Sequence, residues 1–359
     1  MRYDPPPYPA RLARLREGMT QKDALLILHP KNIRYLTGFT GGDGALMAGP
    51  DWLVLLVDGR YVTQAQEEAI GTEIFEFRNR VDGITAVACG RSVEAIGFES
   101  PCLCVEEYLR LQEKLPTVAL RPLSGALQSL RAVKTEGEID RIRAAAVIAG
   151  EALAAIREMI RPGVREQEIA IELEYRMRRG GAEQAAFETI VAAGANAALP
   201  HATPGSRVIK TGDCVTIDYG AVSGGYHSDE TCTYIVGHAS DRQKEVYRLV
   251  REAHDRVIGA IRAGISCGAV DRIARGCLEE AGLGAHFAHG TGHGVGLDVH
   301  EAPRLAAGRE EILRAGMVVT VEPGVYLPGL WGIRIEDTVV VREEGCEVLT
   351  QTSKDLTIL

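Results

Sequence analysis

Short apolar runs alternate with helical patterns along the first third of the chain. Apolar runs occupy residues 24–30, 35–42 and 52–62, and the helix-like segment YVTQAQEEA begins at residue 61. Strands and helices that alternate in this way are typical of a small mixed α/β domain. We therefore expect the chain to begin with a domain of this kind.

The pattern changes between residues 123 and 135, where a long amphipathic segment begins. Thr135 is followed three residues later by Glu138, which is the spacing of a capping box, and the Pro162-Gly163 pair is a typical helix stop. We place a domain boundary at this change, which predicts one domain over residues 1–130 and a second over residues 131–359.

The second part opens with helices and then becomes rich in strands. Ser240 and Gln243 form a second possible capping box at the start of one of its helices. The expected helices are 138–160, 165–180, 241–262 and 268–282, and the expected strands are 214–220, 226–236, 316–327 and 332–343. The order α, α, β, β occurs twice, which suggests a duplicated α+β domain although the two halves share no visible sequence repeat.

Charge and composition exclude several classes of protein. The 359 residues carry a net charge of −9, spread along the chain, which argues against a nucleic-acid-binding surface. No apolar run approaches the ~18 residues of a membrane span, and the N-terminus has no apolar leader core. Eight cysteines without a CxxC pair indicate reduced thiols. We expect a cytoplasmic protein with no membrane or nucleic-acid partner.

Histidine is concentrated in one glycine-rich segment. Four of the nine histidines lie between residues 286 and 300, at His286, His289, His293 and His300. The surrounding sequence, FAHGTGHGVGLDVHEAP, has four glycines, which allow a backbone to run close to a ligand. Packing in a core explains this segment poorly.

Four acidic residues stand in otherwise apolar strand patterns. A buried carboxylate costs several kcal/mol unless a positive group neutralises it. The four acids are Asp218, Asp229, Glu322 and Glu336. A salt bridge or a turn would account for any one of them. Together with one imidazole they form a hard-oxygen donor set, which suits two divalent cations such as Mn²⁺, Co²⁺, Fe²⁺ or Zn²⁺ better than a cysteine-rich structural zinc.

These motifs resemble those of the pita-bread metallopeptidases, in particular the prolidase and aminopeptidase P branch. The resemblance rests on IDYG, GGYHSDET, TGHGVGLDVHE, VEPGVY and GIRIEDT, which contain Asp218, Asp229, His293, Glu322 and Glu336 in that order. The earlier segments NIRYLTGFTG and VDGRYVTQAQEEA resemble the creatinase-like N-terminal domain of the same branch. The resemblance implies a creatinase-like α/β domain followed by a pita-bread catalytic domain of duplicated α+β architecture.

The resemblance also implies a role for each residue of the motifs. Asp218 would bind one metal ion, Asp229 and Glu336 would bridge two, and His293 and Glu322 would complete the second site. Glu322 would also relay a proton. Three histidines would face the substrate, namely His201 in LPHATPG, His289 and His300. A packed or solvated imidazole is the alternative for each of these three.

Alternation along the strands predicts supporting contacts around the acids. Arg334 and Glu336 are two residues apart and would share a face, so Arg334 is expected to pair with Asp218. Thr231 would lie on the same face as Asp229, and Tyr326 would point into either the site or the core. Cys232 stands where the family commonly has arginine, and alternation places it on the opposite face, so we expect altered packing there rather than lost chemistry.

The leading functional hypothesis is an Xaa-Pro dipeptidase, or prolidase, acting on short proline-containing peptides. The alternative is an aminopeptidase P, which releases the residue before proline from longer peptides. Arg304, in HEAPR, matches a position where prolidases bind the free carboxylate of the dipeptide, although a solvated rim arginine would look the same. A metal-free or non-catalytic pita-bread protein is a third class, which the five retained ligands argue against. The family further implies manganese and a homodimer.

Overall fold

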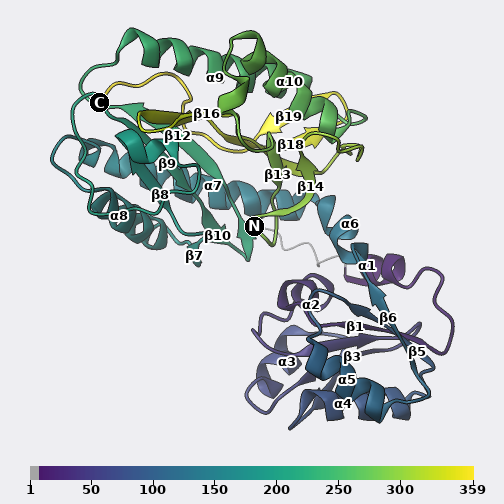
Figure 1. Cartoon of the computed structure of the whole chain (residues 1–359). Helices are drawn as coiled ribbons and strands as arrows, with labels where there is room; N and C mark the ends of the chain where they lie inside the picture. Colours follow the sequence, from purple (N-terminus) through teal and green to yellow (C-terminus); the bar gives the residue numbers. More distant parts are fainter. Residues whose placement is uncertain (1–7) are drawn as a thin grey trace. The chain divides into compact units, whose positions relative to one another are not determined.

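The computed structural model describes residues 8–359 and divides them into two compact units. The first unit ends at Arg131 and the second runs from Ala132 to Leu359 (Figure 1). Residues 1–7, on which the expectation of a leaderless N-terminus partly rests, lie outside the described residues.

The first unit is built on a six-stranded mixed sheet in the order β4-β3-β2-β1-β5-β6. The pairs β1–β2 and β2–β3 are antiparallel, and the other three pairs are parallel. The strands are β1 (Asp23–Ile27), β2 (Ala45–Ala48), β3 (Leu53–Val57), β4 (Glu73–Glu76), β5 (Ala95–Glu99) and β6 (Ala119–Leu123). The predicted mixed α/β architecture is confirmed.

Six helices accompany this sheet. They are α1 (Tyr8–Leu15), α2 (Pro30–Thr37), α3 (Val62–Glu68), α4 (Arg80–Gly90), α5 (Val105–Lys114) and α6 (Ala126–Ala132). The apolar run at residues 35–42 is not a strand, because it contains the end of α2. Gly38 ends that helix with a left-handed φ of 85°, a conformation that glycine adopts without steric cost.

The helices of the second unit follow the predicted pattern closely. They are α7 (Glu136–Ile156), α8 (Glu166–Arg179), α9 (Asp241–Ala260) and α10 (Cys267–Glu280), with short 3₁₀ helices η1 (Arg157–Met159), η2 (Gly194–Ala198) and η3 (Gly284–His286). Both predicted capping boxes form, at Thr135 with Glu138 and at Ser240 with Gln243. These helix starts are encoded locally, because each cap needs only residues three positions apart.

Four small sheets complete the second unit. Their orders are β12-β9-β8, β14-β13-β15-β18-β19, β11-β10-β7 and β16-β17. The strands are β7 (Gln184–Ala185), β8 (Ile190–Ala193), β9 (Cys214–Tyr219), β10 (Ala221–Ser223), β11 (Tyr226–His227), β12 (Glu230–Ile235), β13 (Gly292–Gly294), β14 (Glu301–Leu305), β15 (Val318–Val321), β16 (Gly324–Leu327), β17 (Trp331–Arg334), β18 (Asp337–Arg342) and β19 (Gly345–Val348).

Two hydrophobic cores reflect the repeated α, α, β, β order. In one core, Leu173 of α8 packs with Val191 of β8 and Ile217 of β9. In the other, Val250 of α9 and Val319 of β15 belong to a second buried cluster. Each helix pair therefore covers its own strands, as Figure 1 shows for the α9–α10 pair, and the predicted α+β domain is confirmed.

Three predicted strands are shorter than expected, and each is broken at an acidic residue. The segments 226–236, 316–327 and 332–343 are interrupted at Asp229, Glu322 and Glu336, where we had expected continuous strands. A continuous strand would fix each side chain to one face by strict alternation. At the breaks the backbone instead bonds elsewhere: the Glu322 N–H donates to Thr291 O at 2.9 Å and the Glu336 N–H to Thr231 O at 3.1 Å.

Candidate active site

The register of two strand pairs brings the four acids together. In the β9–β12 pair, Asp218 lies opposite Thr231. Thr231 follows Asp229 by two residues, so Asp218 and Asp229 come close together. In β15–β18, Val321 lies opposite Asp337, so Glu322 and Glu336 stand side by side at the end of this pair. The backbone bond from Glu336 to Thr231 joins the two sheets at this point. The four carboxylates thus converge from separate sheets.

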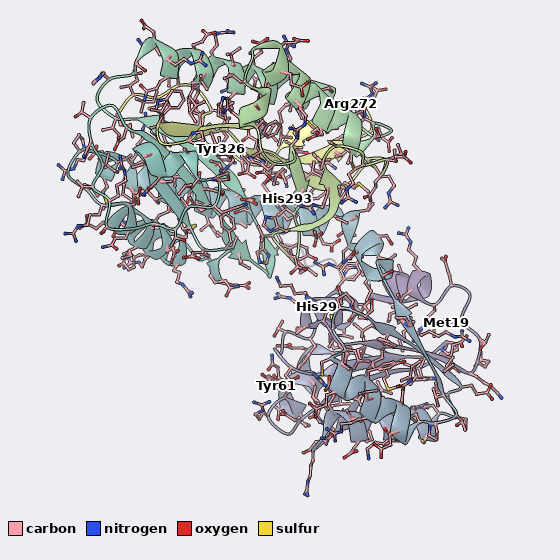
Figure 2. The ribbon with its side chains drawn as sticks, viewed as in Figure 1. Met19, His29, Tyr61, Arg272, His293 and Tyr326 are labelled. Atoms are coloured by element: carbon pink, nitrogen blue, oxygen red, sulfur yellow. The ribbon has the colours of Figure 1, made fainter. Side chains whose placement is uncertain are left out.

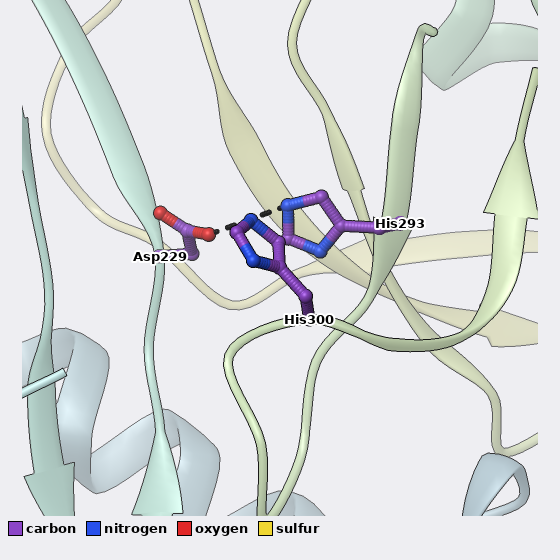
Figure 3. A group of neighbouring side chains, drawn as sticks. All are labelled: Asp229, His293 and His300. Carbon is purple, nitrogen blue, oxygen red and sulfur yellow. Dashed lines mark ion pairs between the residues drawn. The ribbon is translucent and has the colours of Figure 1, made fainter. Parts of the chain in front are cut away.

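His293 reaches these acids because its neighbours are glycines. A Cβ at Gly292 would lie 2.0 Å from Thr320 O, and one at Gly294 would lie 2.2 Å from Ala302 O. The His293 Nδ1 lies 3.1 Å from the Gly294 carbonyl, which can only accept a hydrogen bond, so Nδ1 carries the proton. The unprotonated Nε2 lies 3.6 Å from Asp229 Oδ2 (Figure 3). It also lies 3.4 Å from Glu322 Oε1.

The possible metal-ligand atoms form three overlapping groups. Within each group the atoms lie within 4.8 Å of one another. The groups are Asp218, Asp229 and Glu336; His293, Glu322 and Glu336; and Asp229, His293 and His300. Glu336 belongs to two groups, and so does Asp229, which is the arrangement expected of carboxylates shared between two ions.

The electrostatics of the site fit divalent cations. Burial, followed by repulsion from neighbouring acids, raises the pKa of both Asp229 and Glu336 well above the ordinary range. Burial also raises the pKa of Glu322 to about 7 and lowers the pKa of His293 to about 3, so the imidazole is neutral and able to ligate. Asp218 Oδ1 is buried and has no hydrogen-bond partner among residues 8–359. Cations would satisfy this donor set, as four carboxylates and one imidazole suit hard divalent ions.

Arg334 bonds to several of the groups that surround the acids. Its side chain is almost completely buried, and its Nη2 donates to Asp218 Oδ2 at 2.7 Å, as the alternation predicted. Its Nε donates to the Thr231 hydroxyl at 3.1 Å, and that hydroxyl donates to Glu336 Oε2 at 2.6 Å. One guanidinium therefore orients carboxylates from both sheets.

Tyr326 links Arg334 to His289, and Figure 2 labels it among the strands of the second unit. Arg334 Nη1 donates to Tyr326 Oη at 2.8 Å, and this oxygen lies 2.8 Å from His289 Nε2. His289 Nδ1 faces the Gly290 carbonyl at 2.8 Å and so carries the ring proton, which leaves Nε2 to accept from the tyrosine. Burial lowers the pKa of His289 to about 4, so the ring is neutral. Both of its nitrogens are engaged by protein groups, and its predicted substrate-facing role stays a prediction.

Replacing Tyr326 with phenylalanine tests the hydrogen bonds that join Arg334, Tyr326 and His289. The change leaves His289 Nε2 and Arg334 Nη1 each without one partner, which typically costs about 1–3 kcal/mol for a buried polar group. At roughly 2–4 °C per kcal/mol, we expect the melting temperature to fall by roughly 2–12 °C in calorimetry. Tyr175→Phe is the control, because its hydroxyl lies on the exposed face of α8, 3.2 Å from Arg179. An unchanged melting temperature for Tyr326→Phe would show that these hydrogen bonds do not stabilise the protein.

Three further predicted residues surround these acids on the solvent side. The His300 ring packs edge-on against His293, with ring centroids 4.3 Å apart. Arg304 lies directly opposite His293 in the β13–β14 pairing and is exposed. His201 is also exposed, and Arg334 Nη1 donates at 3.2 Å to the carbonyl of the preceding Pro200. Burial lowers the pKa of His300, the Asp218 carboxylate raises it, and His201 and Arg304 lower it.

One supporting residue was not identified from the sequence. Asp271 of α10 is fully buried and accepts hydrogen bonds from the Thr291 backbone N–H at 3.1 Å and the Thr291 hydroxyl at 2.9 Å. Arg275, one turn later, pairs with Asp271 and donates to the His289 carbonyl at 2.8 Å. This pair anchors the segment that carries His289 and precedes His293. The available signal was an Asp and an Arg at i, i+4 in a helix that also carries Arg272, Glu279 and Glu280.

The fold and the site together define a metallopeptidase. Residues 140–343 match the model of metallopeptidase family M24, and residues 11–133 match the creatinase/prolidase N-terminal domain. The chain therefore belongs to metallopeptidase family M24, and the expectation of an enzyme of this branch is confirmed. Members of the family work with divalent metal ions, in agreement with the cluster of acids and His293.

Full-length relatives support this assignment. The chain is 37% identical over 349 residues to an Xaa-Pro dipeptidase of Pyrococcus furiosus, covering 96% of this chain and 99% of the relative. Among solved structures, an Xaa-Pro dipeptidase from Bacillus anthracis superposes with a TM-score of 0.95 at 40% identity, covering 98% and 100% of the two chains. An X-Pro aminopeptidase from Thermotoga maritima gives 0.90 at 35% identity, covering 97% and 100%.

Two other expectations concern the rest of the molecule. All eight cysteines are free thiols. Cys232 is buried and packs with the α7–α8 core, while its neighbours Thr231 and Thr233 bond to Glu336 and to the backbone of Arg334. Cys232 therefore lies on the face of β12 opposite the metal-ligand candidates, as predicted.

Among residues 8–359, no helix combines the length and the apolar character needed to cross a membrane.

Proposed function

We propose that this metallopeptidase is an Xaa-Pro dipeptidase that uses two divalent ions. The convergence of Asp218, Asp229, His293, Glu322 and Glu336 on one buried site is the observation that carries this proposal. The relatives named as Xaa-Pro dipeptidases are 37% and 40% identical to the chain, against 35% for the X-Pro aminopeptidase, which favours the dipeptidase over aminopeptidase P. Arg304 lies beside His293 and is exposed, so a guanidinium is available for the free carboxylate of a dipeptide.

The chemistry suits a bond that general peptidases handle poorly. The nitrogen of an Xaa-Pro bond carries no N–H, so recognition must use the carbonyl and the charged ends of the peptide. Divalent ions held by these ligands would polarise that carbonyl and lower the pKa of the attacking water. Glu322 would take up the proton from the water and pass it to the proline nitrogen. His201 and His300 hold the oxygen that develops negative charge.

We further propose manganese as the native metal, the cytoplasm as the location and a homodimer as the working form. The oxygen-rich donor set suits Mn²⁺, but Co²⁺, Zn²⁺ and Fe²⁺ accept the same ligands, so supply in the cell decides between them. Eight free thiols fit a reducing compartment. The homodimer follows from the resemblance to the prolidase branch. Metal analysis of the purified protein and light scattering test the first and last of these.

A pair of matched substrates tests the dipeptidase assignment. The metal-loaded enzyme is given an Xaa-Pro dipeptide and the corresponding Xaa-Pro-Xaa tripeptide, with Glu336→Ala as the blank. We expect the dipeptide to be cleaved and Arg304→Ala to raise its KM by roughly 10- to 100-fold, because a hydrogen bond to a charged group contributes about 1.5–3 kcal/mol.

Arg309→Ala is the matched control, since it removes an exposed arginine from the same region. Preference for the tripeptide, with no effect of Arg304→Ala, would make the protein an aminopeptidase P. Metal-dependent cleavage of neither peptide would overturn the proposal.

A further inference from the structure

A second cluster of charged residues lies directly behind the metal site. Glu230 and Asp337 immediately follow Asp229 and Glu336, the two carboxylates shared between the ligand groups. The side chains of Glu230 and Asp337, the first residues of β12 and β18, contact Tyr219, His254 and Lys354 rather than the carboxylates of the site. Their side chains are only 1% and 9% exposed. Two carboxylates are therefore buried at the back of the strands that present metal ligands at the front.

Lys354 supplies the positive charge for both. Its side chain is 4% exposed, and its Nζ donates to Glu230 Oε1 and lies 3.4 Å from Asp337 Oδ1. β12 and β18 belong to different sheets, so this ammonium ties the two sheets together. Lys354 therefore contacts the first residue of each strand, Glu230 in β12 and Asp337 in β18, which directly follow Asp229 and Glu336.

The surrounding contacts hold this arrangement firmly. The Tyr219 hydroxyl donates to Glu230 Oε2 at 2.8 Å, and His254 Nε2 lies 3.1 Å from Asp337 Oδ2. The backbone of Lys354 is held in turn, because its carbonyl accepts from the Tyr247 hydroxyl at 3.0 Å. A buried ammonium with two carboxylate partners and an anchored backbone has little freedom to move.

The small side chain of Cys232 leaves space for the Lys354 ammonium. Its Sγ lies 3.5 Å from Lys354 Nζ, on the face of β12 opposite the metal ligands. An arginine at position 232, which the resemblance leads one to expect, would bring a cation to this region from β12 itself. Here the cation comes instead from the C-terminal segment, across 122 positions of sequence.

We propose that Lys354 is a positioning residue for the metal centre, which sets the separation of the Asp229 and Glu336 carboxylates by joining β12 to β18 through Glu230 and Asp337. The inference rests on the proposed function only in taking Asp229 and Glu336 as metal ligands. Removal of the ammonium leaves two buried carboxylates that repel each other, and the strand starts move apart. Residues that orient metal ligands typically change metal affinity by about 10- to 100-fold.

Manganese binding to the full-length, metal-free protein tests this role. We expect Lys354→Met to weaken Mn²⁺ affinity by about 10- to 100-fold in titration calorimetry, and Lys354→Arg to restore most of it, because the positive charge is retained. Lys244→Met is the matched control, since it removes an exposed ammonium 3.7 Å from Asp241. Titrations are made well below each variant's melting temperature, so that a loss of fold stability alone leaves the affinity unchanged.

A double variant keeps the test decisive if Lys354→Met does not fold. Lys354→Met with Glu230→Gln removes one positive and one negative charge, so the net charge of the buried cluster is unchanged, but the link that Lys354 makes between Glu230 and Asp337 is missing. We expect this variant to fold and to bind Mn²⁺ weakly. Affinity equal to that of the wild type, in either variant, would overturn the inference. Absence of Mn²⁺ binding by the wild type would instead overturn the proposed function, so the two failures are distinguishable.

Discussion

Glu336→Gln is expected to abolish metal-dependent hydrolysis while making the metal-free protein more stable. Glu336 belongs to two of the three ligand groups, so its loss impairs both ion sites at once. Lewis-acid stabilisation by bound ions is worth several kcal/mol, and a loss of about 4 kcal/mol corresponds to roughly a 1,000-fold decrease in rate. The measurements are kcat on the dipeptide at saturating Mn²⁺ and the number of ions bound per chain.

The gain in stability follows from the direction of the pKa shift. Burial and repulsion from Glu322 and Asp218 raise the pKa of Glu336 above its value in the unfolded chain. The metal-free wild type therefore loses stability as the pH rises from the unfolded pKa of about 4.3 through the folded pKa. Glutamine keeps the size of the side chain and does not ionise, so its melting temperature in chelator at pH 7 should exceed that of the wild type. A lower value would show that the four carboxylates do not repel one another as the structure indicates.

Arg334→Met is expected to give the largest loss of stability. The guanidinium pairs with Asp218, bonds to Thr231 and Tyr326, and is almost completely buried. Removing one partner of a buried ion pair typically costs about 3–5 kcal/mol. At roughly 2–4 °C per kcal/mol, the melting temperature of the metal-free protein should fall by roughly 6–20 °C at pH 7.

The pH dependence separates loss of charge from loss of packing. Asp229, Glu322 and Glu336 all have raised pKa values, chiefly because they are buried, and they become neutral as the pH falls. The difference between wild type and Arg334→Met should therefore shrink toward pH 4. Arg334→Lys retains the charge but not the fork of donors, so it should lie between the two. A difference that stays constant from pH 7 to pH 4 would mean that packing, rather than charge, accounts for the effect.

Much of the helical structure and the types of chemical group were predictable from the sequence. The starts of α7 and α9 were placed by capping boxes, which involve contacts only three residues apart. The acids and the glycine-flanked His293 stood out because such groups are costly in apolar strands, and the resemblance gave them a common role. The pairing of Arg334 with Asp218 could be expected because side chains alternate along a strand.

The local geometry of the site depends on contacts that no short stretch of sequence contains. Asp229, Glu322 and Glu336 lie in breaks between strands. The backbones of Glu322 and Glu336 bond to Thr291 and Thr231, and the Asp229 carbonyl accepts from the Thr338 hydroxyl. The sequence allows Tyr326 to point into the core or into the site, and its contacts with Arg334 and His289 place it beside the site.

By itself, the sequence predicted a mixed α/β domain, an α+β domain and the approximate extent of the helices of the second, since these follow from periodicity and local spacing, while the resemblance supplied the roles of the candidate ligands. Only the tertiary structure decided which groups meet. Lys354 lies 124 positions from Glu230, and Asp271 lies 20 positions from Thr291. Such contacts are set by strand register and by the packing of helices on sheets, and both of these depend on the whole folded chain.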